Sequence, residues 1–436
     1  MLTVAATAAL GVPRTLTAQS IDTTAALQSL RDYASACALD HGRLWGHSLC
    51  GPIALVDRTT RLSISNDTLP DRAYLPYIDA FIGVLPTLLG IANTSVEWKG
   101  RRWALVVLPA PLDRFDHTAL LVHEAFHREQ PTLLLGGSDP ANPHLDELEG
   151  RRWLRLELRA YAAALAADAA AGRTLTMDAL LFRARRHALY PAADSIEPAL
   201  EMQEGLAEYS GVRLALDLTS EPVTRAIARI RDFEKTPSFV RSFAYATGPA
   251  IGLSLDRYAD GWRDTIRHTH DPATLLAGAL HFRAPPDLQR VAERHAGRYG
   301  GDEILREENT RDSARRSRLA LYRARLMAGP TLLLRQRSLN RSFDPNSLVP
   351  FDSSATIYPT GTFSSAWGSL EVTSGGALVA NDGTWIRVIA PPTLPDQGSR
   401  TVQGEGWTLS LSLHWSIRTV ASGQPGMEVV APSSLP

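Results

Sequence analysis

The sequence predicts an α+β fold with a small N-terminal mixed sheet, a mostly helical middle region and a C-terminal antiparallel β module. Three observations predict this order. Short alternating apolar runs separated by polar turns precede residue 109, as is typical of strands. Apolar residues at helical spacing dominate from about residue 117 to residue 330. Beyond Pro330, short alternating runs return among frequent Ser, Thr, Gly and Pro residues.

The composition limits the classes of function. With 436 residues, of which 44% are hydrophobic, the chain is long enough for two or three packed domains. The formal net charge is -1, so no overall positive field favours nucleic acid as a partner. No apolar run reaches the length of a membrane span, and we therefore expect no integral membrane segment. Nothing in the sequence indicates an oligomeric state.

Residues 1–20 have features of a signal peptide, with an apolar first half and small residues near Ala18. They lack the usual basic start, because the first charged residue is Arg14. We expect the protein to be exported, either to the periplasm or out of the cell. In an oxidising compartment the two cysteines, Cys37 and Cys50, would form a short-loop disulfide.

Residues 21–116 predict an N-terminal α/β unit. A helical pattern at 21–37 is followed by two short strands, at 52–56 and 61–65, around a polar turn. A further strand at 101–109 ends in a proline-rich loop. We interpret this last strand as the edge of the sheet, where an extended peptide can add as another strand.

A His-Glu-x-x-His motif, His123 to His127, follows this strand inside an apolar helical pattern. Residues four apart lie on one face of a helix, so both imidazoles can bind one metal ion. Glu124 then lies beside the metal, where its carboxylate can act as a general base toward water. The motif is short and can also occur by chance. In that alternative, the two histidines are hydrogen-bonded in an ordinary core and bind no metal.

The limits of this helix are set by polar residues and a proline. Asp116 or Thr118 can cap its start, since short polar side chains accept hydrogen bonds from the first free N–H groups. Pro131 ends it after Gln130.

Helical patterns continue through the rest of the middle region. Three helices are predicted between residues 145 and 216, and others at 249–281 and 286–327. We therefore assign residues 117–330 to one helical subdomain.

The C-terminal part reads as a separate β unit. We assign residues 331–345 to a linker and residues 346–436 to a β-sandwich-like module. Its tryptophans lie within alternating runs, which favours a sandwich core over an exposed platform for sugar or protein. They are Trp367, Trp385, Trp407 and Trp415.

A zinc hydrolase needs a third protein ligand besides two histidines, and keeps a fourth position for water. A histidine six residues beyond His127 is absent, because Leu133 stands there. A carboxylate is therefore required, and two candidates are Glu147 and Glu204. Glu147 lies nearer in the sequence, but Arg151 follows it one turn later, where an acid is wanted to orient an imidazole.

The segment Glu201-Met-Gln-Glu-Gly-Leu-Ala-Glu-Tyr-Ser-Gly resembles the second zinc-binding helix of gluzincin metallopeptidases, which carries Glu-Gly-x-Ala-x-Tyr text. The resemblance implies that Glu204 is the third zinc ligand. It also implies that Glu208 accepts a hydrogen bond from a ligating imidazole and fixes its tautomer. The glycine after Glu204 removes a side chain where two helices approach. The chain departs from the family in its connection, since 76 residues separate His127 from Glu204.

A second short match to the aminopeptidase branch of this family is Tyr245-Ala-Thr-Gly248. By resemblance, Tyr245 would donate a hydrogen bond to the oxyanion that forms when water attacks a carbonyl. A tyrosine packed at a helix start, before ordinary turn residues, is the alternative interpretation. Together, the motifs resemble a zincin-like catalytic domain that holds Zn2+.

The sequence therefore predicts a secreted zinc metallopeptidase, a hydrolase that acts on peptide or protein substrates. Two alternatives remain open. One is an exported binding or scaffold protein that keeps a peptidase-like fold without activity. The other is a zinc amidohydrolase that acts on a non-peptide amide.

Overall fold

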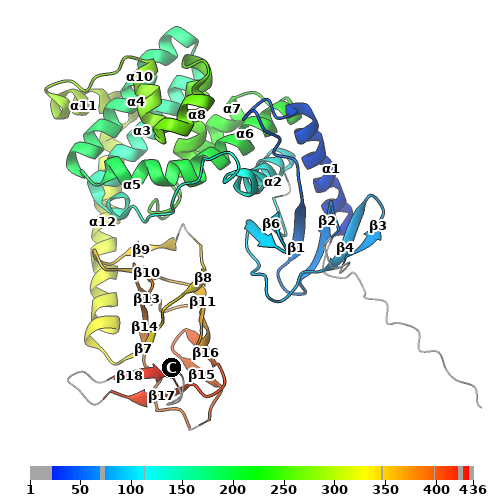
Figure 1. Ribbon diagram of the computed structural model, residues 1–436. Coiled ribbons are helices and arrows are strands. Elements are labelled where there is room, and N and C mark those ends of the chain that lie inside the picture. The colour runs from blue at the N-terminus through cyan, green and yellow to red at the C-terminus, as the bar shows by residue number, and fades with distance from the viewer. Residues whose placement is uncertain are drawn as a thin grey trace, which may run out of the picture.

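The fold is α+β, as predicted, with an N-terminal sheet, a helical region and a C-terminal β module (Figure 1). The predicted signal peptide, residues 1–20, lies outside the described residues. Within the part of the chain that is described, no helix has both the length and the apolar character needed to cross a membrane. The structure is a computed structural model that describes residues 22–68, 74–111, 113–344, 347–396, 398–420 and 426–431.

The N-terminal sheet is mixed, as predicted, with strand order β3-β4-β2-β1-β6-β5. β1 and β6 run parallel, with Ile53 opposite Ala104, and the other neighbours are antiparallel. The predicted strands at 52–56 and 61–65 are present as β1 and β2. The strands are β1 (Ile53–Asp57), β2 (Leu62–Ser65), β3 (Tyr74–Tyr77), β4 (Ala80–Val84), β5 (Thr94–Trp98) and β6 (Arg101–Leu108).

Two helices, α1 (Thr23–Asp40) and α2 (Arg114–Glu129), pack on one face of this sheet. Leu121 and Ala125 of α2 contact the same apolar cluster as the inward residues of β1, β2 and β6. The opposite side of α2 carries Val122 and Phe126 into the core of the helical region. α2 is therefore held between the sheet and the other helices, which fixes the position of its side chains.

The helical region surrounds one large apolar core that includes Trp153, Phe182 and Tyr209. Its α-helices are α3 (Leu148–Ala166), α4 (Ala169–Leu189), α5 (Ala193–Leu200), α6 (Leu206–Thr219), α7 (Thr224–Phe233), α8 (Ala244–Tyr258), α9 (Trp262–Thr269), α10 (Pro272–Ala279), α11 (Leu288–Ala296) and α12 (Gly301–Arg323). Short 3-10 turns are η1 (Pro143–Asp146) and η3 (Gly297–Tyr299), and π-helical turns are η2 (Glu201–Gly205) and η4 (Ala324–Ala328). The three helices predicted before residue 216 correspond to α3, to α4, and to α5, η2 and α6 in continuous sequence.

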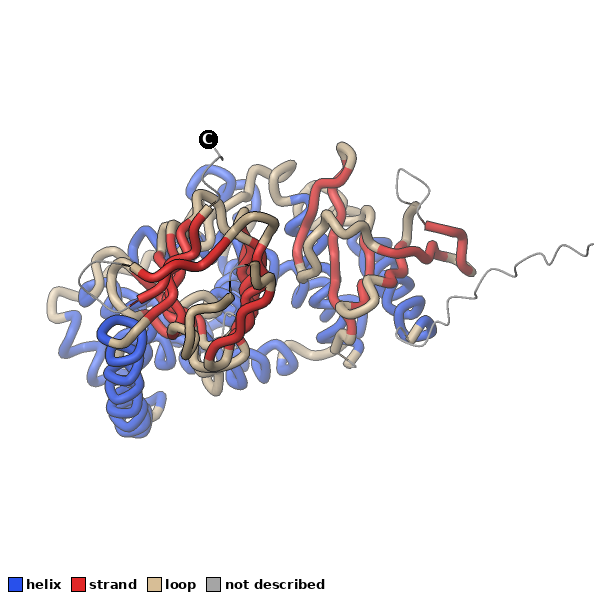
Figure 2. Tube along the Cα trace, turned by 90° about the horizontal axis from the view of Figure 1, so that it is seen from below, coloured by secondary structure: helices blue, strands red, loops and turns tan. Residues whose placement is uncertain are grey.

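The C-terminal module consists of two sheets that enclose an apolar core (Figure 2). Trp367 and Trp407 are buried in this core, and Trp385 and Trp415 are half-buried against apolar clusters, which supports the sandwich-core interpretation. The pairing is antiparallel except between β18 and β7, which run parallel. The first sheet has the order β17-β18-β7-β14-β13-β10-β9 and the second β15-β16-β12-β11-β8.

The strands of the module are short and closely spaced along the chain. They are β7 (Thr331–Arg335), β8 (Asn340–Ser342), β9 (Val349–Pro350), β10 (Ala355–Tyr358), β11 (Gly361–Ser365), β12 (Gly368–Val372), β13 (Ala377–Ala380), β14 (Trp385–Ile389), β15 (Thr401–Gly404), β16 (Trp407–Leu411), β17 (Ser416–Thr419) and β18 (Gly426–Val430).

The prediction of a linker at 331–345 is wrong. β7 lies inside the seven-stranded sheet and β8 forms the edge of the five-stranded sheet. The reason is the alternation in β7, which buries Leu332 and Leu334 in the module core. The module therefore begins at Thr331, and only Gly329 and Pro330 separate it from η4.

The two cysteines are free thiols, so the disulfide expected for an exported chain is not present in the structure. Cys37 is buried near the end of α1, whereas Cys50 is exposed. Burial, with the neighbouring Cys50 thiol, raises the pKa of Cys37 and keeps that thiol protonated.

Candidate metal centre

α2 carries the His-Glu-x-x-His motif, and its ends are fixed by local capping. The Asp113 carboxylate accepts a hydrogen bond from the Asp116 N–H at 3.0 Å, so the cap is Asp113 and not the predicted Asp116 or Thr118. Thr118 is instead fully buried on the helix. The predicted end is confirmed, because Gln130 is the C-cap and Pro131 follows it.

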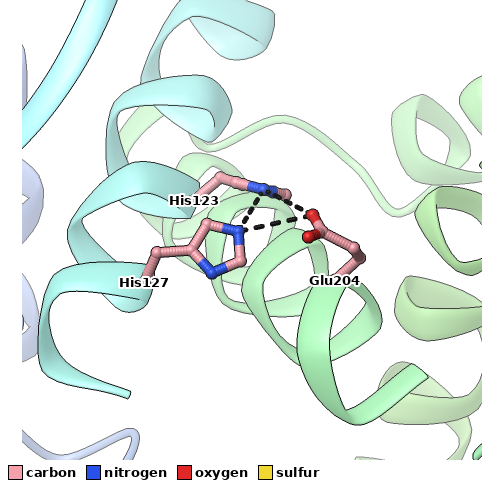
Figure 3. Close-up of side chains that lie close together, drawn as sticks. All are labelled: His123, His127 and Glu204. Carbon is pink, nitrogen blue, oxygen red and sulfur yellow. Dashed lines mark hydrogen bonds and ion pairs between the residues drawn. The ribbon is translucent and has the colours of Figure 1, made fainter. Parts of the chain in front are cut away.

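Glu204 joins His123 and His127 in one compact cluster (Figure 3). The Nε2 atoms of the two imidazoles are 3.0 Å apart. Oε2 of Glu204 lies 3.4 Å from Nε2 of His123 and 3.3 Å from Nε2 of His127. The three atoms lie within 4.8 Å of one another, and no other group of His, Cys, Asp or Glu among the described residues has spacing suited to a metal ion.

The hydrogen bonds of the two imidazoles assign their tautomers. Nδ1 of His123 is 2.9 Å from a carboxylate oxygen of Glu208, which can only accept. Nδ1 of His127 is 2.9 Å from Oε1 of Gln130, whose amide nitrogen donates to three backbone carbonyls. When both imidazoles are neutral, both Nε2 atoms present lone pairs toward the Glu204 carboxylate. These three groups repel one another unless a positive charge lies among them, either a proton on His123, whose pKa the Glu204 and Glu208 carboxylates raise, or a metal ion. The donor set of two imidazoles and one carboxylate fits a divalent metal ion.

Glu208 is held in its ionised form by a second partner. Its other carboxylate oxygen accepts a hydrogen bond from Arg229 of α7, which also pairs with Asp116 at the start of α2. Burial opposes ionisation, but the charge of Arg229 and the hydrogen bond with His123 lower the pKa of Glu208. The structure thus places Glu208 against a candidate ligand, where the resemblance requires it.

Glu147, the alternative third ligand, lies elsewhere. It is exposed at the N-cap of α3 and accepts a hydrogen bond from the Tyr190 hydroxyl at 3.1 Å. It belongs neither to the cluster nor to the cleft around it. The structure brings Glu204, and not Glu147, to the two histidines.

Glu124 is buried beside the cluster and lines the same cleft. Its Oε2 has no hydrogen-bond partner among the described residues. Burial raises the pKa of Glu124, although the neighbouring His123 and His127 act in the opposite direction. A buried carboxylate with a free oxygen and a raised pKa has the properties of a general base.

Tyr245 projects into the cluster from the first turn of α8. Its ring stacks on that of His123, with centroids 5.5 Å apart and planes at 7°. Its hydroxyl donates a hydrogen bond to Oε2 of Glu204 at 2.8 Å. Burial and the negative charge of Glu204 raise the pKa of Tyr245, so the phenol keeps its proton. Gly248 and Pro249 lie inside α8, so the alternative in which they form an ordinary turn is wrong.

Two glycines let the helices around the cluster approach closely. A Cβ on Gly248 of α8 would lie 2.3 Å from the Cα of Gly205, the residue after Glu204. A Cβ on Gly211 of α6 would lie 2.3 Å from the carbonyl oxygen of Ala119 on α2. The first contact agrees with the prediction that the glycine after Glu204 permits a close helix approach. Both crossings are needed to hold Glu204 and Tyr245 near α2.

A buried ion-pair network fixes the π-helical turn that carries Glu204. Glu201, at the start of η2, accepts hydrogen bonds from Arg183 of α4 and from the Thr247 hydroxyl of α8. Arg183 also binds Glu157 of α3 at 2.9 Å. The turn is thus attached directly to α4 and α8, and through Arg183 to α3. π-Helical turns are frequent at functional sites.

The cleft in front of the cluster has a volume of about 660 Å³ and is bordered on the sheet side by β5 and the residues before it. β5, and not the predicted strand at 101–109, forms the edge, because β6 lies between β1 and β5. Lys99 and Gly100, both with positive φ, form the tight turn that joins β5 to β6. This hairpin was not recognised in the sequence.

Several site residues were not predicted from the sequence. Gln130 had a usable signal, since it lies three residues after His127 on the same helix. Asn93 and Ser95 line the cleft because β5 is the sheet edge. Arg229 reaches the site only through tertiary packing and had no local signal.

No protein-family model, curated protein or solved structure matches this chain. The functional argument therefore depends on the residues and geometry described above.

Proposed function

We propose that this protein is a zinc-dependent peptidase of the gluzincin type, in which His123, His127 and Glu204 hold the ion. One observation carries the proposal: two imidazole lone pairs and a carboxylate converge on one space, next to a buried glutamate with a free oxygen. When bound there, zinc would polarise the substrate carbonyl and lower the pKa of water to about 7.

Side chains of this protein would carry out the proton transfers. Glu124 accepts a proton from the attacking water and returns it to the leaving amine, because its Oε2 is free of other partners. Tyr245 donates its hydroxyl proton toward the developing oxyanion, which requires its hydrogen bond to shift from Glu204. Glu208 and Gln130 keep the two imidazoles in the tautomers that leave Nε2 free.

The substrate backbone would bind along β5. Among the described residues, this edge strand pairs with β6 on one side and with no strand on the other. An extended peptide can add there through main-chain hydrogen bonds, which recognise any sequence. Asn93 and Ser95 lie at this edge and also line the cleft, so peptide bound there passes the metal cluster.

The deciding test is Glu124→Gln in the zinc-loaded full chain. We expect hydrolysis of casein or of a mixed peptide library to fall by about 10² to 10⁴ fold, because the general base is lost. Glu129→Gln on the same helix is the matched control, since Glu129 pairs with Arg128 and lies outside the cleft. Metal analysis should give about one zinc per chain for all three proteins. Undiminished hydrolysis by Glu124→Gln, or absence of zinc from the wild type, would contradict the proposal.

A further inference from the structure

We infer that the C-terminal β module forms one wall of the substrate cleft, and that Phe343 in it selects substrates with an apolar side chain. The inference rests on the proposed peptidase function. Ser342 and Phe343 line the same cleft as His123, Glu204 and Tyr245, although more than 90 residues separate them in sequence from Tyr245. Residues of the module and residues at the start of β5 both line this cleft, and Figure 1 shows the module and the N-terminal sheet as separate parts, each next to the helical region.

Phe343 is held in place by the module core. It follows β8, which pairs with β11 through Ser342 and Thr362. Its ring packs edge-on against Tyr358, with centroids 5.0 Å apart and planes at 87°. Tyr358 is itself buried and accepts a hydrogen bond from Arg341 at 3.0 Å. The half-buried ring of Phe343 thus has one side packed and another in the cleft.

The module is also attached firmly to the helical region. Arg311 and Arg315 of α12 both bind the buried carboxylate of Asp146 in η1, at 2.9 and 2.7 Å. These ion pairs fix α12 to η1 in the helical region. Farther along α12, Leu319 packs with Phe351 of the module in a shared apolar cluster. The helix therefore contacts both sides and sets the position of Phe343 relative to the metal cluster.

The chemistry of the cleft explains what Phe343 would recognise. On the sheet side the lining is mainly polar, with Asn93, Thr94 and Ser95 at the edge strand. Successive side chains of an extended peptide point to opposite faces, so every second one faces the module. An apolar substrate side chain there gains contact with the phenyl ring, whereas glycine gains none.

The test uses internally quenched octapeptides that carry Gly, Leu or Phe at one varied position, and the zinc-loaded full chain. We expect the wild type to prefer Leu or Phe over Gly by about tenfold in kcat/KM at one position or more. Phe343→Ala should reduce this preference at least about threefold, through a higher KM for the Leu and Phe peptides. Phe343→Trp should instead disfavour the Phe peptide by filling the cleft.

Trp415→Ala is the matched control, since Trp415 packs on the same module core but does not line the cleft. We expect it to keep the wild-type preference. A second readout does not need turnover: Phe343→Ala in the Glu124→Gln background should weaken binding of the Leu peptide, measured by fluorescence anisotropy, and not that of the Gly peptide. Wild-type preference in both Phe343 variants, with zinc and thermal midpoint retained, would overturn the inference. Loss of zinc or of all hydrolysis in the wild type would instead contradict the proposed function.

Discussion

The two imidazoles of the candidate centre donate hydrogen bonds to chemically different acceptors. His123 donates to the charged carboxylate of Glu208, whereas His127 donates to the neutral amide of Gln130. A carboxylate partner makes the opposite ring nitrogen a stronger donor to a metal than an amide partner does. The Gln130 amide has no freedom to exchange its two ends, because its nitrogen is committed to three carbonyls.

At the scale of single residues, removing the Tyr245 hydroxyl has a specific expected effect on catalysis. Tyr245→Phe should lower kcat by about 10² to 10³ fold with little change in KM, because an oxyanion donor acts mainly in the transition state. Zinc content should stay at the wild-type value, since the tyrosine is not a ligand. Steady-state kinetics on a quenched peptide measures both constants.

The control for Tyr245 is Tyr190→Phe, which removes a hydroxyl bonded to the exposed Glu147, and neither residue lines the cleft. It should leave kcat unchanged. An equal kcat for wild type and Tyr245→Phe would show that this hydroxyl only supports Glu204.

Most of the residue-level site follows from sequence motifs, because a helix converts a spacing of four residues into a shared face. This is why His123, Glu124 and His127 were predictable. Glu204 needed the resemblance, since no local rule relates it to a histidine from which 76 residues separate it. Arg229 and Phe343 reach the site by long-range packing, for which the sequence has no local pattern.

At the scale of elements, the site depends on a close crossing between η2 and α8. Gly248→Ala should lower the free energy of unfolding by about 1–3 kcal/mol, because the new Cβ would lie 2.3 Å from Gly205. The strain also moves Glu204, so zinc affinity should fall in parallel. Urea denaturation measures the first effect and zinc titration the second.

Gly278→Ala provides the control for that substitution. Gly278 is also helical, in α10, but nothing lies within 4 Å of a Cβ built there. We expect unchanged or slightly higher stability, by up to about 1 kcal/mol, since alanine has less conformational freedom in the unfolded chain. Equal stability of Gly248→Ala and Gly278→Ala would contradict the close crossing.

Element boundaries were less predictable than element types. The tight turn at Lys99 and Gly100 joins two strands, and without it the edge strand was assigned to β6. Likewise, the predicted linker overlooks β7, because the neighbours of β7 in the sheet, β14 and β18, come much later in the chain. Strand pairing depends on such distant partners, whereas a helix satisfies its own backbone.

At the scale of the whole molecule, the metal would join α2 to η2 and so link the sheet side to the helical core. Removing zinc with 1,10-phenanthroline should lower the thermal midpoint and abolish hydrolysis, and added zinc should restore both. At free zinc 100 times the dissociation constant, the expected stabilisation is about 2.7 kcal/mol. Differential scanning calorimetry with and without zinc tests this.

The same experiment has a defined pH dependence. Burial disfavours the charged imidazole of His123, but hydrogen bonds with Glu204 and Glu208 raise its pKa above 6.5 in the metal-free protein. Since zinc binds the neutral imidazole, protons compete with it, and zinc affinity should fall as pH decreases. His127→Ala should remove the zinc-dependent shift, whereas His268→Ala, at an exposed position, should keep it. A midpoint that is independent of zinc at every pH would contradict the centre.

Because α12 is one continuous helix, insertions within it have a predictable effect on the structure. Its 23 residues are about 34 Å long, and only η4, Gly329 and Pro330 separate it from the first strand of the module. Inserting one residue into α12, between its contacts with η1 and its contacts with the module, would rotate the module by about 100° about the helix axis. This rotation would move Phe343 away from the metal cluster. An insertion of seven residues, about two full turns, would nearly preserve the angle but displace the wall by about 10 Å. The number of residues in α12 thus determines both the rotation and the displacement of the module, and therefore the width of the cleft.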